Sequence, residues 1–289
     1  MTRNEKRERM PSDERYRAAV MAPRPYRIVD ADSVAPGEMT LTLAPIPSPD
    51  AGLPGDGRQE PGQYWILHTP RGAQIPVVPT MTTGAQREVT TLRVPCEPPI
   101  GRVGDRVGLR GPLGRGWDLQ GAPGRDLLVV AWEAGLKLVR PVLEQAITQS
   151  RTGQGFSRIR VWAGGHTWAA IPYKREWNRW SGRAGVTVSA SRTLTMAAAA
   201  HEVELDTAST LALLAGPPPM AVATAIALTH RGMPAADIQL ATHSLLRCGN
   251  GRCGRCDITT PHGVVRACAD GPVLRYDRLA PRSPDRPAG

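Results

Sequence analysis

The first half of the chain alternates short apolar segments with stretches rich in Gly and Pro. Alternating and β-branched residues predict strands, because successive strand side chains point to opposite faces of a sheet. The predicted strands are Tyr26–Asp32, Met39–Ala44, Gln63–His68, Glu88–Val94 and Asp105–Arg110. Strands at this spacing, with no helix between them, predict a small β-barrel.

From Gly121 onward, apolar strands alternate with helical segments. Asp126–Trp132 reads DLLVVAW, a continuous apolar run typical of a buried parallel strand. The other predicted elements are strands Ile159–Ala163, Gly185–Ser189 and Thr210–Ala215, and helices Lys137–Gln149, Trp168–Trp180 and Met220–Arg231. Pro141 would be tolerated only near the first turn of its helix. This alternation indicates a doubly wound α/β domain.

These differences in sequence pattern divide the 289 residues into four parts. Residues 1–20 are a mixed-charge lead-in that we expect to be disordered. Residues 21–120 form the barrel, 121–240 the α/β domain and 241–289 a cysteine-bearing tail. This size suits about two domains with substantial cores.

The net charge of +10 comes from Arg residues scattered through the chain. No recognition motif accompanies this charge, so we expect no nucleic-acid partner. The first residues are charged and lack the apolar segment of a signal peptide. The apolar stretch Ser209–Leu228 is broken by three consecutive prolines, which argues against a membrane-spanning helix. The sequence therefore predicts a cytoplasmic protein.

Four of the five cysteines gather near the C-terminus. Cys248, Cys253, Cys256 and Cys268 have the spacing C-x4-C-x2-C-x11-C. The x4 and x2 spacings in a Gly-rich loop are typical of plant-type [2Fe–2S] ligands, with the fourth thiolate supplied from further along. Glycines in such a loop allow the backbone to wrap tightly around a cluster.

Structural zinc is the alternative to an iron–sulfur cluster. Zinc sites usually pair two C-x2-C units, whereas here the other spacings are x4 and x11. A cytoplasmic location disfavours disulfides. Arg247, Arg252 and Arg255 flank the cysteines and could offset a negative cluster. Cys96 is isolated and is not expected to be a ligand.

Several further motifs accompany the cysteines: Pro61–Tyr64 (PGQY), Gly111–Trp117 (GPLGRGW), Gly216–Pro218 (GPP) and Cys268–Val273 followed by Tyr276. With the order of barrel, α/β domain and cysteine tail, residues 22–280 resemble the ferredoxin-reductase-like electron-transfer subunits. These include the gamma subunits of NiFe hydrogenases and sulfhydrogenases, the corresponding subunit of anaerobic sulfite reductase and the dihydroorotate dehydrogenase electron-transfer subunit.

The resemblance implies a flavin held by the barrel, NAD(P)H held by the α/β domain and single electrons leaving through the cluster. It implies flavin-side contacts from Gln63, Tyr64, Thr80, Gly111 and Gly114, and nicotinamide-side contacts from Gly135, Gly216 and Pro217. No catalytic residue is assigned. We therefore expect a [2Fe–2S] cluster, with FAD as a further candidate.

Three departures bear on the nucleotide sites. The family's G-G-x-G-x-A-P loop is replaced by Trp132–Leu138 (WEAGLKL), where a plain strand-to-helix turn is the better interpretation. The flavin phosphate motif R-x-Y-S corresponds to Ile75–Met81, which has no Arg and whose only hydroxyl is that of Thr80. The C-G-P-P turn has Ala215 in place of Cys. NAD(P) binding is therefore disfavoured.

The sequence predicts an iron–sulfur electron-transfer subunit of a multisubunit, hydrogenase-like oxidoreductase, whose partners are other redox subunits. One alternative is an active FAD-dependent NAD(P)H:acceptor reductase with atypical phosphate contacts. A second is a structural or assembly subunit in which the metal serves only to fold the tail.

Overall fold

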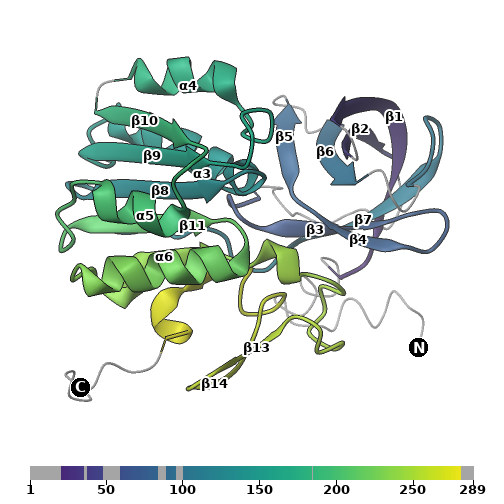
Figure 1. Ribbon diagram of the computed structural model, residues 1–289. Helices are drawn as coiled ribbons and strands as arrows, with labels where there is room; N and C mark the ends of the chain where they lie inside the picture. Colours follow the sequence, from purple (N-terminus) through teal and green to yellow (C-terminus); the bar gives the residue numbers. More distant parts are fainter. Residues whose placement is uncertain are drawn as a thin grey trace. The chain divides into compact units, whose positions relative to one another are not determined.

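The computed structural model describes residues 21–35, 38–47, 59–83, 89–95, 100–183 and 185–280 (Figure 1). The chain divides into two compact units that alternate along the sequence. The antiparallel unit contains Gln63–Gly114 and Arg247–Cys253 together with the chain up to Gln59. The α/β unit contains Glu60–Gly62, Arg115–Leu246 and the chain from Gly254 onward.

The predicted lead-in, residues 1–20, lies outside the described residues, and so does Cys96. None of the described helices combines the length and the apolar character that a membrane crossing requires.

The antiparallel unit is built on one sheet, in which every neighbouring pair of strands is antiparallel. Its described strands, in the order β4-β3-β7-β1-β2-β6-β5, are Gln74–Val77, Tyr64–His68, Arg106–Leu113, Arg24–Ala35, Glu38–Pro45, Val89–Pro95 and Pro79–Thr83. Alternating apolar residues, among them Ile28, Leu41, Leu67 and Leu109, are almost completely buried and form its core. The five predicted strands are present, whereas the short β4 and β5 were not predicted.

The sheet of the α/β unit has the strand order β10-β9-β8-β11-β12-β15. These strands are Val186–Ser191, Arg158–Gly164, Asp126–Trp132, Thr210–Ala215, Ile238–Ala241 and Val273–Arg275. All neighbours are parallel except β12 and β15. Every residue of β8 and β11 is buried, as the apolar runs predicted.

Helices cover both faces of this sheet (Figure 1). They are α3 (Gly135–Ser150), α4 (Lys174–Ser181), α5 (Met196–Glu202) and α6 (Pro218–His230). Leu127 and Val129 of β8 join the core cluster of α3 and α4, whereas Leu128 and Val130 join that of α5 and α6. The doubly wound prediction is therefore confirmed at the level of layers.

Two helices differ from the prediction. The helix predicted from Trp168 begins only at Lys174, because Pro172 disfavours the helical conformation of Ile171 and Tyr173 has a left-handed φ of 63°. Helix α3 begins at Gly135, so Pro141 lies in its second turn rather than near its first. The buried side chains around it keep this helix packed on the sheet.

The tail, expected to be irregular, is tied to the sheet at both ends. Strand β12 precedes the cysteines, β15 follows them, and the two pair with Leu240 opposite Leu274. Between them lie the 3-10 helix η2 (His243–Leu245) and the hairpin β13–β14 (Asp257–Thr260 and Gly263–Arg266). After β15 the 3-10 helix η3 (Tyr276–Arg278) follows.

Candidate functional site

Cys248 and Cys253 lie in the antiparallel unit and are accessible to solvent. Burial raises the pKa of the Cys248 thiol, but hydrogen bonds from the backbone of Asn250, the Cys253 thiol and backbone, and the backbone of Arg252 outweigh it. Together they lower the pKa to about 6. A lowered pKa favours the thiolate of Cys248, which is the form that binds metal.

Glycine shapes the loop that carries these cysteines. Gly249, Gly251 and Gly254 all have left-handed φ values, of 66°, 73° and 67°. At Gly249 a Cβ would lie 2.9 Å from Ile66 Cγ1 and 3.0 Å from Leu113 Cδ1, so the loop backbone lies directly against the strands of its unit. Any other side chain there would be strained and would clash.

Cys256 and Cys268 lie in the α/β unit, at the two ends of the β13–β14 hairpin. They are 2% and 4% exposed, and the Ala267 N–H donates to the Cys256 carbonyl at 3.1 Å. None of these four cysteines forms a disulfide. Within the described ranges, no three potential ligand side chains already converge on a metal position.

The donor set nevertheless fits an iron–sulfur cluster. It consists of four soft thiols, one with a lowered pKa, on a loop whose glycines permit a tight wrap. Cys253 and Cys256 are only three residues apart, so the chain limits their Cα atoms to a separation of about 11 Å.

A buried arginine, missed in the sequence, contacts this loop. Arg110 of β7 is 5% exposed and donates from Nη2 to the Cys248 carbonyl at 2.5 Å and from Nη1 to the Gly249 carbonyl at 3.3 Å. It lies 138 residues before Cys248, so no local pattern could have revealed the contact.

Four predicted flavin-side residues lie on or beside the neighbouring strands β3 and β7, whereas Thr80 lies in β5 at an edge of the sheet. Gln63 Nε2 donates to the Gly114 carbonyl at 3.1 Å, which fixes the turn after β7. Gly111 has a φ of 152°, and a Cβ there would lie 2.8 Å from the Trp65 ring. Tyr64 is fully buried in β3, and Thr80 lies in β5.

The comparisons with known proteins match these features. Residues 243–280 match the family described as the iron–sulfur cluster binding domain of dihydroorotate dehydrogenase B. The gamma subunit of sulfhydrogenase 2 from Pyrococcus furiosus is 25% identical over 298 residues, which cover 89% of this chain and 98% of that protein. A probable dihydroorotate dehydrogenase B (NAD(+)) electron transfer subunit from Methanothermobacter thermautotrophicus is 29% identical over 182 residues, covering 61% of this chain and 62% of that one.

Solved structures give the fold. A structure of NADH-dependent reduced ferredoxin-NADP oxidoreductase superposes with a TM-score of 0.64 at 20% identity, covering 88% of this chain and 91% of that one. The chain is similar to the ferredoxin-reductase-like electron-transfer subunits. Its fold is that of the ferredoxin reductases, as predicted.

In a ferredoxin-reductase-like fold, a dinucleotide would lie at the carboxyl ends of the parallel strands, near the N-terminus of α3. Here aromatic rings pack at the carboxyl end of β8. The Trp132 ring stacks on Trp162 with centroids 6.2 Å apart, and it meets the His166 ring edge-on at 5.3 Å. Trp132 is 7% exposed and Trp162 is 4% exposed.

A carboxylate also lies in the loop after β8. Glu133 has a left-handed φ of 46°, and its Oε1 accepts a hydrogen bond from the His166 N–H and lies 2.9 Å from His166 Nδ1. Burial alone would raise the pKa of Glu133, but the bonds to His166 outweigh it and lower the pKa. An anionic side chain therefore stands where a pyrophosphate would need cations or free N–H groups.

The glycines that the resemblance places at the nicotinamide side pack so closely that neither position could carry a Cβ. A Cβ at Gly135 would lie 2.0 Å from the Ala215 carbonyl oxygen, and one at Gly216 would lie 2.7 Å from Met196 Sδ. Pro217 is the residue before the first turn of α6. These glycines serve close packing within the chain. The misfit with an NAD(P) pyrophosphate comes from the Glu133 carboxylate in the same loop.

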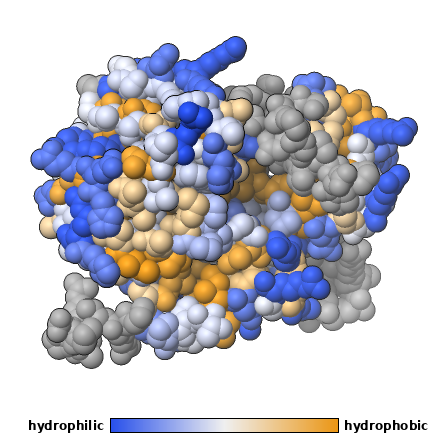
Figure 2. Space-filling view, in the orientation of Figure 1, coloured by the Kyte–Doolittle hydropathy of each residue, from blue (hydrophilic) through white to orange (hydrophobic). Residues whose placement is uncertain are grey.

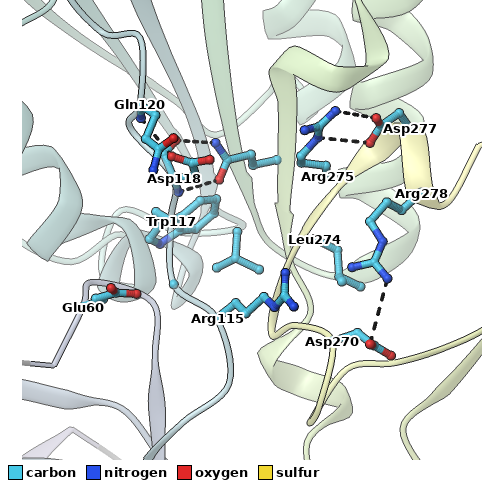
Figure 3. A pocket seen from close by; sticks show the side chains of 13 residues that line it. Glu60, Arg115, Trp117, Asp118, Gln120, Asp270, Leu274, Arg275, Asp277 and Arg278 are labelled. Carbon is cyan, nitrogen blue, oxygen red and sulfur yellow. Dashed lines mark hydrogen bonds and ion pairs between the residues drawn. The ribbon is translucent and has the colours of Figure 1, made fainter. Parts of the chain in front are cut away.

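A separate polar cavity of about 740 Å³ lies in the α/β unit, beside β12 and β15 (Figure 3). Its charged groups largely pair with one another: Arg275 with Asp277 at 2.6 Å, and Arg278 with Asp270 at 3.9 Å. Gln239 both donates to and accepts from the backbone of Asp118. The cavity was not predicted from the sequence.

Proposed function

We propose that this chain is an iron–sulfur electron-transfer subunit of a multisubunit oxidoreductase. Cys248, Cys253, Cys256 and Cys268 would ligate one [2Fe–2S] cluster. The observation that carries the proposal is the C-x4-C-x2-C-x11-C thiol set inside the segment that matches an iron–sulfur binding domain. When bound, such a cluster accepts and donates single electrons.

The chain's own part in this function is to hold and shield the cluster. The glycine turns bring backbone N–H groups close to Cys248, and the same bonds that lower its pKa would orient its sulfur toward a metal. Burial of Cys256 and Cys268 keeps two of the ligands away from oxidants in solution.

We further propose that the chain exchanges electrons with a partner subunit and not with a nicotinamide bound beside α3. Trp132, Glu133 and His166 support this, because they add bulk and negative charge at the carboxyl end of β8, beside α3. The relatives are named as gamma or electron transfer subunits, which supports assembly into a complex.

An apolar face on the α/β unit is consistent with a partner. Val222 and Ile226, one helical turn apart on α6, are 37% and 40% exposed. Figure 2 shows apolar surface in the region of this helix. Exposed apolar surface of this kind is common where subunits meet.

The flavin-side turn favours FAD as the second redox group. Its Gln63–Gly114 hydrogen bond is in place. We place the protein in the cytoplasm, where free cysteines such as these remain reduced.

Cofactor content tests the proposal. Iron, sulfide, zinc and flavin per chain would be measured on protein purified without air, together with the EPR spectrum after reduction. We expect iron and sulfide in equal amounts and no stoichiometric zinc. Zinc in place of iron would favour the structural alternative, and NADH-driven dye reduction with bound FAD would favour the reductase alternative.

A further inference from the structure

Among its described residues, the antiparallel unit contains a buried cation without a carboxylate partner. In that part of the chain, the groups that accept hydrogen bonds from the Arg110 guanidinium are the carbonyls of Cys248 and Gly249 and the sulfur of Met21. Burying a charge costs free energy unless an opposite charge compensates it. Neutral carbonyls compensate only in part, so the described arrangement lacks an anion.

The positive charge of Arg110 affects a neighbouring histidine. Burial lowers the pKa of His68, and the charge of Arg110 lowers it further. His68 Nε2 is buried and has no hydrogen-bond partner within the described part of the chain. No described carboxylate pairs with Arg110 to cancel its positive potential.

We propose that Arg110 positions the Cys248 segment and raises the reduction potential of the cluster. This rests on the proposed function, because the missing anion is then the iron–sulfur cluster held by Cys248. Reduction adds an electron to the cluster, and a nearby buried cation stabilises the added negative charge. The guanidinium fork also fixes two successive carbonyls, which a single amine could not do as rigidly.

Arg110 differs in this respect from the arginines beside the cysteines in sequence. Arg247, Arg252 and Arg255 are exposed, so water and salt screen their charges. Arg110 acts from inside the sheet, where screening is weak. We therefore expect it to contribute more to the potential than any of the three.

The test compares three variants of the full-length protein, purified without air. R110Q removes the buried charge, and R110K keeps the charge but loses the fork. R106Q removes the same charge from the exposed start of the same strand and is the matched control. The readouts are iron per chain, the rate of cluster loss in air and the midpoint potential from a dithionite titration followed by EPR.

We expect R110Q to shift the midpoint to lower potential and to lose its cluster several-fold faster. R110K should keep a potential near that of the wild type but lose its cluster faster, and R106Q should match the wild type in both. An R110Q cluster with wild-type potential and wild-type lifetime would overturn the proposal.

If R110Q does not fold, the R110K variant is the test. An R110K cluster that is lost no faster than that of the wild type, or whose midpoint potential is clearly lower than that of the wild type, contradicts the proposal. A wild-type protein without iron would instead overturn the proposed function itself, so the two failures are distinguishable.

Discussion

Glu133 and His166 are joined twice, because both the backbone N–H and the ring Nδ1 of His166 lie 2.9 Å from the same carboxylate oxygen. The pair joins the loop after β8 to the loop after β9, on the β9 side of the strand-order switch between β8 and β11. Together with the Trp132 ring, it places packed aromatic side chains and a carboxylate at the carboxyl end of β8, next to that switch. We expect this arrangement to prevent a dinucleotide from binding there.

NADH and NADPH should give no saturable binding to the wild-type protein, measured by equilibrium dialysis. Replacing both loop residues, in W132A/E133G, should create space and remove the negative charge, so that binding becomes measurable. Truncating Trp132 should cost about 3 kcal/mol of the free energy of unfolding. W168A, which removes a 46% exposed tryptophan from the same unit, is the control. Tight NADH binding by the wild type would show that Trp132 and Glu133 do not block the nucleotide site.

G135A should destabilise the protein by about 2 kcal/mol or more, because its Cβ would meet the Ala215 carbonyl oxygen at 2.0 Å. The free energy of unfolding would be measured by urea denaturation. G182A, where the nearest atom would be 3.1 Å away and φ is −72°, should cost less than about 1 kcal/mol. Equal effects at the two positions would mean that the loop after β8 is not closely packed.

C253S should abolish iron binding and leave the apoprotein fold intact, because Cys253 is exposed and serine is nearly isosteric. Iron per chain and the visible spectrum measure the first effect, and thermal unfolding measures the second. C96S, which changes the isolated cysteine, should retain full iron. Loss of apoprotein stability in C253S would favour a purely structural role for the tail.

Lowering the pH from 6.5 to about 4 should destabilise the native state through His243. Burial lowers the pKa of His243 to about 4, although its bond to the Gly62 carbonyl at 2.8 Å opposes this. The unfolded ring takes up a proton near pH 6.5, so the unfolded state binds more protons throughout this window, and stability falls as pH falls. The loss contributed by this ring should approach about 1 kcal/mol per pH unit.

H243Q isolates this contribution, because a glutamine amide can still donate to Gly62 but does not titrate. The free energy of unfolding of both proteins would be measured by urea denaturation at several pH values. The difference between wild type and H243Q should change with pH below 6.5 and become independent of pH above 6.5. A difference that is independent of pH between 4 and 6.5 would show that His243 is not the group responsible.

The sequence predicted the α/β core well because burial dictates it. β8 and β11 have the predicted bounds, since an uninterrupted apolar run fits only a strand covered on both faces. β4 and α5 were missed because each is short and β4 contains a proline. The pairing of β12 with β15 could not be predicted, because it joins residues far apart in the chain.

For the candidate site, residue types and spacing were sufficient for the cysteines but not for their surroundings. The departures at Trp132 and Glu133 were visible in the sequence, yet their partners Trp162 and His166 come from the next strand and its loop. Arg110 gave no signal at all, because its role depends on a contact across 138 residues.

The Thr242 N–H and hydroxyl both donate to the Pro272 carbonyl, each at 2.7 Å. The cysteine segment is thus an insertion whose two ends are already fastened together by the sheet. Its loop-closure entropy is lost when β12 and β15 pair, before any metal arrives. We therefore expect the polypeptide to fold before the cluster is inserted.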